Sequence, residues 1–165
     1  MPKLLAEINQ NQTLKHRLFQ VEYLNTLSGD MLVTMIYHRQ LDDAWINNAK
    51  ELKEKLGINI IGRAKKMKIL LDKDHVIEEL NIDDRLLKYK QIEGGFTQPN
   101  GIMNINMLTW ARACVEGSER FDLLELYCGN GNFSIAMADK FRRVFATEIS
   151  KSSVHAALAN KEMNG

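Results

Sequence analysis

The chain has 165 residues, of which 45% are hydrophobic and 26% are charged. These proportions are typical of a folded globular protein, and they exclude a disordered tail, a collagen-like fibre and a disulfide scaffold. The formal net charge is +1, so the chain lacks the broad basic excess of proteins that bind nucleic acid non-specifically. A local basic patch in a site-specific RNA enzyme remains compatible with this charge.

The number of cysteines and the absence of long apolar runs indicate the cellular compartment of the protein. Cys114 and Cys128 are too few for a secreted scaffold and indicate free thiols in a reducing environment. The first residues lack the apolar core of a signal peptide. No apolar run approaches the roughly 18 residues of a spanning helix. We therefore predict a cytoplasmic protein.

The first part of the chain, residues 1–93, predicts an α+β segment with several antiparallel connections. A helix begins near Pro2, with Leu4, Leu5 and Ile8 on one face. Alternating residues from position 19 to 23 and a turn at 28–30 predict a hairpin with residues 31–37. A further helix begins at Asp42 or Asp43 and ends before Gly57. Short strands are predicted at 58–62, 67–71 and 86–92.

The second part, residues 94–165, predicts a βαβ unit. A helix over about residues 102–115 is followed by an apolar run at 122–127, which is typical of a parallel strand buried on both faces. Residues 128–132 form a tight turn, and Phe133 begins another helix. A second strand at 144–147 leads directly to Glu148. This order of strand, glycine loop, helix and strand with an acid at its tip is suited to a nucleotide-like ligand.

The glycine loop and the acid carry the predicted chemistry. Gly129 and Gly131 lack a Cβ, so the backbone can turn sharply and a ligand can come close. Glu148 lies 19 residues after Gly129, close to the roughly 20 expected for an acid that accepts hydrogen bonds from ribose hydroxyls. The pattern therefore predicts a cofactor that contains adenosine.

Three sequence patterns narrow the choice of cofactor. Ser134 stands where the dinucleotide fingerprint has a third Gly or Ala, which disfavours a pyrophosphate. The phosphate-binding loop of nucleoside triphosphatases is absent. Glu125, Gly129 and Gly131 instead resemble the E-x-x-x-G-x-G pattern of class I S-adenosylmethionine-dependent methyltransferases.

Longer stretches resemble one family of RNA-modifying enzymes. The segments FTQPN at 96–100, LLELYCGNGNFS at 123–134 and ATEI at 146–149 are similar to the uracil-5 RNA methyltransferases. The earlier half, including residues 18–20, 37–38 and 41–43, resembles the bacterial tRNA (uracil-5-)-methyltransferases. The resemblance implies an α/β protein. Residues 1–93 would form part of an RNA-binding domain, and residues 94–165 would begin a Rossmann-like methyltransferase sheet.

The same resemblance implies an activity and a cofactor site. The enzymes of this family transfer a methyl group from S-adenosylmethionine to carbon 5 of a T-loop uridine in tRNA, and they also act on transfer-messenger RNA. Four residues match family contacts to the cofactor: Gln98, Tyr127, Asn132 and Glu148. Glu148 would bind the ribose hydroxyls, and Asn132 and Tyr127 would flank the methionine end. Gln98 has an alternative structural role, in the turn that starts the next helix.

The family's catalytic groups have no counterpart in this sequence. Carbon 5 of uracil is a poor nucleophile, so these enzymes first add a cysteine thiolate of an S-C-N-P motif to carbon 6. A glutamate later removes the proton from carbon 5, and a D-P-P-R motif contacts the cofactor. We therefore expect an internal fragment that is inactive alone and that a complementary carboxyl-terminal fragment would complete. The alternatives are a ribosomal RNA uracil-5 methyltransferase and a non-catalytic RNA-binding fragment.

Other reactive or charged residues have ordinary structural interpretations. Cys128 in the loop and Cys114 on a helix are both expected to be packed in the interior rather than to act as nucleophiles. The four histidines have no metal-ligand spacing, so no metal site is predicted. A basic cluster, at Arg63, Lys65, Lys66 and Lys68, is either a solvated strand edge or a contact to RNA phosphates.

Overall fold

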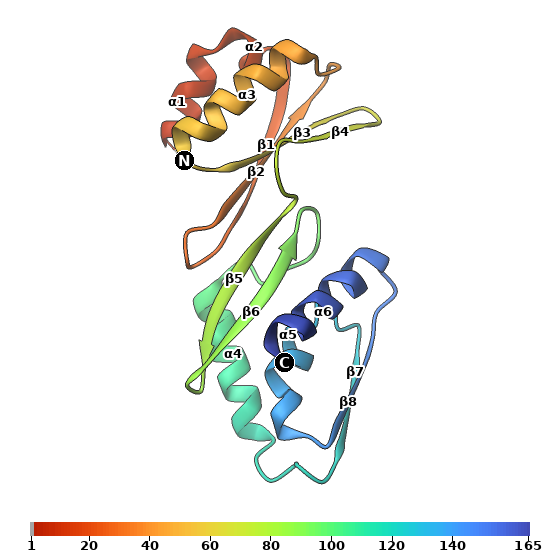
Figure 1. Ribbon diagram of the computed structural model, residues 1–165. Helices are drawn as coiled ribbons and strands as arrows, with labels where there is room; N and C mark the ends of the chain where they lie inside the picture. Colours follow the sequence, from red (N-terminus) through yellow and green to blue (C-terminus); the bar gives the residue numbers. More distant parts are fainter. Residues whose placement is uncertain (1) are drawn as a thin grey trace. The chain divides into compact units, whose positions relative to one another are not determined.

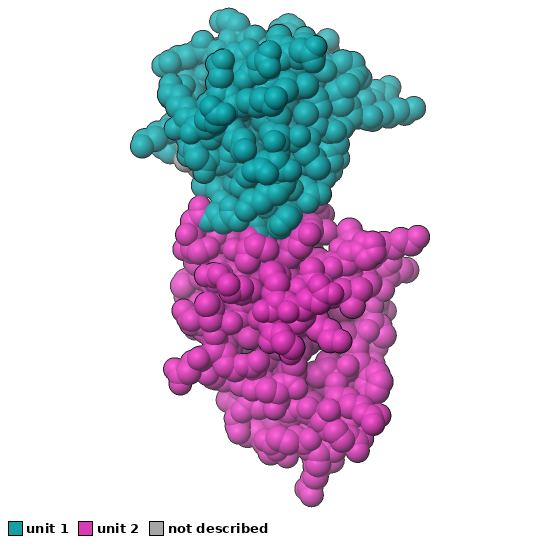
Figure 2. All heavy atoms as spheres, in the orientation of Figure 1, with its two compact units in different colours: residues 1–25, 30–76 teal, residues 26–29, 77–165 magenta. Residues whose placement is uncertain are grey.

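The computed structural model describes residues 2–165, which form two compact units (Figures 1 and 2). The first unit comprises residues 2–25 and 30–76, and the second comprises residues 26–29 and 77–165. The boundary that we predict at Glu93 lies inside the second unit. Strand β6 (Arg85–Ile92) packs against the later helices α5 (Asn132–Met137) and α6 (Lys151–Asn164).

The first unit contains a four-stranded sheet in the order β1-β2-β3-β4. The pairs β1–β2 and β3–β4 are antiparallel, whereas β2 and β3 are parallel. The two antiparallel pairs confirm the predicted antiparallel connections. The parallel pair was not specified by the sequence; it follows from helix α3 (Asp43–Leu56), which crosses from one strand to the other. The elements of this unit are α1 (Pro2–Gln10), α2 (Gln12–Lys15), β1 (Leu18–Asn25), β2 (Met31–Tyr37), α3 (Asp43–Leu56), β3 (Asn59–Ala64) and β4 (Met67–Leu70).

Helix α3 packs on this sheet through Trp45, which is completely buried. The Asp42 side chain accepts a hydrogen bond from the Trp45 amide at 2.8 Å, and Gly57 ends the helix with φ 64°. Both helix ends confirm the sequence prediction. A Cβ on Gly62 of strand β3 would lie only 2.4 Å from the Trp45 ring, so glycine is required where the ring meets the sheet. In α1, Leu4 and Ile8 are buried as predicted, but Leu5 is exposed.

The second unit contains two small sheets and three α-helices among its described residues (Figure 1). Strand β5 was not predicted; a two-residue turn, in which Asp83 and Asp84 have positive φ angles, joins it to β6. Strands β7 and β8 are parallel, with Leu124 opposite Phe145, which confirms the βαβ unit. The elements are β5 (His75–Ile82, whose first two residues belong to the first unit), β6 (Arg85–Ile92), α4 (Gly101–Cys114), β7 (Asp122–Leu126), α5 (Asn132–Met137), the 3₁₀-helix η1 (Ala138–Lys140), β8 (Arg143–Thr147) and α6 (Lys151–Asn164).

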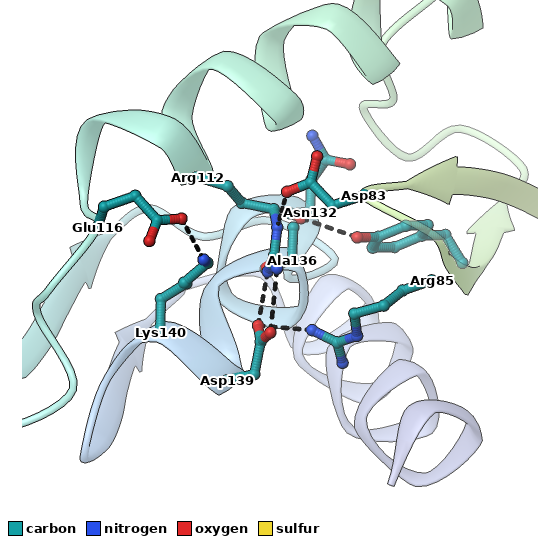
Figure 3. Close-up of polar contacts among 9 residues, drawn as sticks. Asp83, Arg85, Arg112, Glu116, Asn132, Ala136, Asp139 and Lys140 are labelled. Atoms are coloured by element: carbon teal, nitrogen blue, oxygen red, sulfur yellow. Dashed lines mark hydrogen bonds and ion pairs between the residues drawn. The ribbon is translucent and has the colours of Figure 1, made fainter.

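A buried arginine on α4 connects several elements of the second unit (Figure 3). Arg112 is only 3% exposed. Its Nε donates to Asp83 in the β5–β6 turn at 2.7 Å, and its Nη2 donates to Asp139 in η1 at 3.0 Å. Nη1 donates to the carbonyl oxygen of Ala136 in α5, and Arg85 of β6 also pairs with Asp139. A buried guanidinium therefore has acceptors from three directions, as burial of a charge requires.

This cluster predicts an acid-sensitive contribution to stability. The hydrogen bond from Arg112 lowers the pKa of Asp139 to about 2, below its usual value of 3.8. Because the pKa is lowered in the folded state, ionised Asp139 stabilises the fold above about pH 4, and this contribution is lost as the pH falls toward 2. Asp139→Asn should therefore cost about 1 kcal/mol at pH 7, a modest value because Asp139 is partly exposed, and little at pH 2.

Urea unfolding of the wild-type chain and the variant at both pH values measures this difference. Asp84→Asn, at an exposed aspartate of the β5–β6 turn, is the control and should cost little at either pH. An Asp139→Asn effect that is equally large at pH 7 and pH 2 would contradict the assignment.

Candidate functional site

The glycine loop connects β7 to α5 in a conformation that few residues adopt. Gly129 and Gly131 have φ angles of 59° and 82°, in the left-handed region. A Cβ on Gly129 would meet nothing within 4 Å, so this stretch of backbone is open to an approaching ligand. Tyr127, directly before the loop, also has a positive φ of 58°, which is uncommon for an aromatic residue. The loop is therefore a constrained turn with an open outer side.

Glu148 closes this loop from the neighbouring strand. Because β7 and β8 are parallel, their carboxyl ends meet at one edge of the sheet. The Gly129 amide donates to Glu148 Oε2 at 2.9 Å, and the amides of Ile149 and Ser150 donate to Oε1 at 2.8 and 2.7 Å. These hydrogen bonds lower the pKa of the Glu148 carboxyl. The bond from Ser150 has the largest effect, and the bond from Gly129 has the next largest. Glu148 is thus an anion fixed beside Gly129. The contact with ribose hydroxyls that its spacing predicts stays a prediction.

The backbone and side chain of Asn132 are both held by other elements. The Tyr89 hydroxyl of β6 donates to the Asn132 carbonyl oxygen at 3.1 Å. Figure 3 shows Asn132 near Arg112 and Asp83. The Asn132 carboxamide exchanges two hydrogen bonds with Asn104 of α4. Sequence reasoning missed Asn104, although its spacing of four from Leu108 on the predicted helix indicates the same face.

Tyr127 directly precedes the glycine loop and Gln98 lies in the segment before α4, and neither side chain is hydrogen-bonded to Glu148 or Asn132. The Tyr127 side chain is 84% exposed where β7 ends. Gln98 is half-buried in the segment before α4, and Asn100 caps that helix by accepting from the Met103 amide at 2.9 Å. The turn that starts a helix is therefore present. A cofactor contact by Gln98 or Tyr127 remains a prediction.

Glu125 has a structural partner on the following helix. Glu125 accepts a hydrogen bond from the Ser134 hydroxyl of α5. Ser134 stands at the position where the dinucleotide fingerprint has its third small residue. Burial raises the pKa of the Glu125 carboxyl. This pair joins β7 to α5, which explains why serine suits this position.

Cys128 is packed in the interior, as predicted. Its side chain is buried, and burial, followed by the charges of Glu125 and Glu148, raises the pKa of its thiol. A raised pKa keeps the thiol protonated, which is unsuited to a nucleophile. Cys114, by contrast, is exposed at the end of α4. The expectation that Cys114 lies in the core is wrong, because Asn104, Leu108 and Arg112 form the buried face of that helix.

One face of the parallel pair is not covered. Leu124 and Leu126 of β7 are 62% and 60% exposed, and Phe145 of β8 is 52% exposed. The apolar run does form a strand, but the prediction of burial on both faces is wrong for the chain as described. Parallel strands are normally covered on both faces, so this surface is suited to contact with more polypeptide.

A cavity of about 470 Å³ lies on the other side, between β8 and the helices α5 and α6. Its lining includes Arg143, Val144, Leu158 and Lys161. Of the four predicted cofactor residues, only Glu148 lines it. Cys128 and Gly131 of the glycine loop line it as well, so the cavity reaches the loop and Glu148 but not Gln98, Tyr127 or Asn132.

The basic cluster lies on the hairpin formed by β3 and β4. Lys65 and Lys66 are exposed in its turn, and Lys68 on the edge strand pairs with Asp74 at 3.5 Å. These positions suit a solvated edge, and contact with RNA remains a prediction. Among residues 2–165, no group of three or more His, Cys, Asp or Glu side chains is placed to hold a metal ion. Nor is any helix in that range long and apolar enough to cross a membrane.

A parallel strand pair with a glycine loop and an acid at the next strand tip defines an α/β protein, and in this class ligands bind at the carboxyl ends of the strands. The family model described as tRNA (Uracil-5-)-methyltransferase matches residues 1–165. The chain belongs to this family.

Curated relatives agree with the family model. A tRNA/tmRNA (uracil-C(5))-methyltransferase from Shewanella baltica (strain OS185) is 56% identical over 169 residues, which cover 100% of this chain and 46% of the relative. The corresponding protein from Aliivibrio fischeri (strain MJ11) is 54% identical, with 99% and 46% covered. The chain thus spans about half the length of the curated relatives that it matches.

A solved structure shares the fold. The crystal structure of Pyrococcus abyssi tRNA (uracil-54, C5)-methyltransferase, a complex with S-adenosyl-L-homocysteine, matches with a TM-score of 0.70 at 18% identity. The match covers 98% of this chain and 43% of that chain. The mixed α/β fold therefore corresponds to part of a larger methyltransferase chain.

The geometry around Glu148 predicts the effect of neutralising it. Glu148→Gln leaves an uncharged oxygen acceptor opposite only one of the Gly129 and Ser150 amides and places an NH2 donor opposite the other. Hydrogen bonds to a carboxylate are also roughly twice as strong as neutral ones. We expect hydrogen exchange at both amides to accelerate about tenfold, measured by NMR. Glu162→Gln, on the exposed face of α6, should leave them unchanged. Equal exchange in both variants would show that Glu148 does not hold the loop.

Proposed function

We propose that this chain is part of a cytoplasmic tRNA (uracil-5-)-methyltransferase. The whole enzyme would transfer a methyl group from S-adenosylmethionine to carbon 5 of a T-loop uridine in tRNA and transfer-messenger RNA. Within this chain, the observation that carries the proposal is the Glu148 carboxylate held beside Gly129 at the ends of two parallel strands. The activities named for the relatives, which act on tRNA and tmRNA, favour these substrates over ribosomal RNA.

The residues present fit an adenosine-containing cofactor. A carboxylate has about four acceptor positions; two on Oε1 are used by Ile149 and Ser150, and one on Oε2 is used by Gly129. One position on Oε2 is left for a ribose hydroxyl. The open side of Gly129 gives the ligand room to approach. Glu148 would therefore bind the ribose while keeping its bonds to the backbone.

Three further residues would complete the cofactor contacts. The Asn132 carboxamide and the exposed Tyr127 ring would flank the methionine end, and Gln98 would contact the cofactor from the segment before α4. S-adenosylmethionine supplies an electrophilic methyl group when it is bound. The residues of this chain would bind and orient it, and they would keep the loop in place during the reaction.

The nucleophile and the base of the family are proposed to lie in other polypeptide. Cys128 is unsuited to attack because its thiol is buried and its pKa is raised. The exposed apolar face of Leu124, Leu126 and Phe145 would be covered by helices of a class I methyltransferase domain whose sheet continues beyond these two strands. The first unit would form part of the RNA-binding domain. A chain with these residues alone would be inactive and would require a complementary carboxyl-terminal fragment.

Methyl transfer with a complementing fragment tests this proposal. The chain is co-expressed with the part of the Shewanella baltica relative that lies beyond the matched region, and label from S-adenosylmethionine is followed into unmodified tRNA. We expect labelled 5-methyluridine only when both polypeptides are present. Activity from the chain alone would contradict the assignment of the catalytic groups, and label only in ribosomal RNA would contradict the substrate.

A surface variant tests the docking face in the same assay. Leu126→Asp places a charge on the exposed face of β7 and should reduce complementation at least about tenfold, since an unpaired charge is costly to bury. Leu5→Asp is the matched control, because Leu5 and Leu126 are both 60% exposed. Equal activity of the two variants would exclude the β7–β8 face as the docking surface.

A further inference from the structure

Asn104 and Asn132 form a reciprocal pair of side-chain amides. Asn104 Nδ2 donates to Asn132 Oδ1 at 3.0 Å, and Asn132 Nδ2 donates to Asn104 Oδ1 at 2.8 Å. The two hydrogen bonds run in opposite directions. They therefore fix the plane of the Asn132 carboxamide and determine on which side its nitrogen lies and on which side its oxygen lies. Rotation of this group by half a turn would place like atoms opposite each other and lose both bonds.

Asn104 is an unusual residue for its environment. It is 4% exposed on the face of α4 that also buries Leu108 and Ala111. A polar amide at such a position is costly unless it is hydrogen-bonded, whereas replacing both partners of a buried pair by apolar groups of the same shape can be nearly neutral. The pair therefore serves to orient the Asn132 carboxamide rather than to stabilise the core.

The pair leaves half of the Asn132 hydrogen-bonding capacity available. Each carboxamide has two N–H donors and two acceptor positions, and Asn104 uses one of each on Asn132. The Asn132 side chain is half-buried, in contrast to Asn104. Its remaining donor and acceptor suit a zwitterionic amino-acid group, which offers a carboxylate to accept and an ammonium to donate.

We infer that Asn104 is a positioning residue, which fixes the Asn132 carboxamide in the orientation that binds the amino-acid end of the methyl donor. This inference rests on the proposed function and deepens it. Tyr89 holds the Asn132 backbone through its carbonyl oxygen, and Asn104 holds the side chain. Asn132 therefore meets the ligand with little freedom left to lose, which favours binding.

A double-mutant cycle on this chain separates positioning from a general structural role. The dissociation constants of S-adenosylhomocysteine and of adenosine, which lacks the amino-acid end, are measured by NMR titration for wild type, Asn104→Leu, Asn132→Ala and the double variant. We expect Asn104→Leu to weaken S-adenosylhomocysteine about tenfold and adenosine by less than about twofold. In the Asn132→Ala background, Asn104→Leu should change the affinity for S-adenosylhomocysteine by less than about twofold.

Two further variants control for folding and for the helix itself. Asn106→Leu makes the same change at an exposed position of α4 and should leave both affinities unchanged. Asn104→Asp keeps the size and the acceptor but loses the donor, so it should weaken S-adenosylhomocysteine and spare adenosine even if the leucine variant does not fold.

The outcomes distinguish this inference from the proposed function. A loss that is equal for both ligands, or equal in both backgrounds, would overturn the positioning role and leave the cofactor site intact. If the wild-type chain bound adenosine at least as tightly as S-adenosylhomocysteine, the amino-acid end would contribute nothing to the affinity. That result would also overturn the positioning role. Binding of neither ligand by the wild-type chain would contradict the proposed cofactor site and this inference together.

Discussion

The hydrogen bond between the Gly129 amide and the Glu148 carboxylate is the contact on which the candidate site depends. It joins the loop after β7 to the end of β8, and two more amides bind the same carboxylate. A charged acceptor with three backbone donors stays ionised and fixed. The direction of the remaining acceptor position is thus set by the backbone rather than by a free rotamer.

Residues from outside the βαβ unit hold the same loop from other directions. Asn160 of α6 is fully buried; its Nδ2 donates to the Asn130 carbonyl at 2.8 Å, and its Oδ1 accepts from the Lys90 amide of β6 at 2.6 Å. Tyr89 and Asn104 hold Asn132. The hairpin β5–β6 and helix α4 therefore belong structurally with the loop, which is why they fall in the second compact unit with it.

The sequence predicts local structure well and non-local contacts poorly. Asp42 and Gly57 were identified because capping needs only neighbouring residues. The position of Glu148 at the end of β8 could be predicted because its distance along the chain reflects one βαβ turn; its contact with a ribose stays a prediction. Strand β5 was missed because its charges obscure the alternation of buried residues. The roles of Asn104 and Arg112 depend on partners about 28 residues away, which spacing within a helix cannot reveal. The exposure of Leu124 depends on which other elements cover that face of the sheet, and the residues around Leu124 do not reveal this.

A crystal structure of this chain with S-adenosylhomocysteine is the most direct measurement of the central claim. We expect a ribose hydroxyl within hydrogen-bonding distance of Glu148 Oε2, with the Gly129 amide still bound to the same oxygen and the amino-acid end beside Asn132. A ligand that lies in the cavity between β8 and α6 without contacting Glu148, or that displaces Glu148 from Gly129, would contradict it.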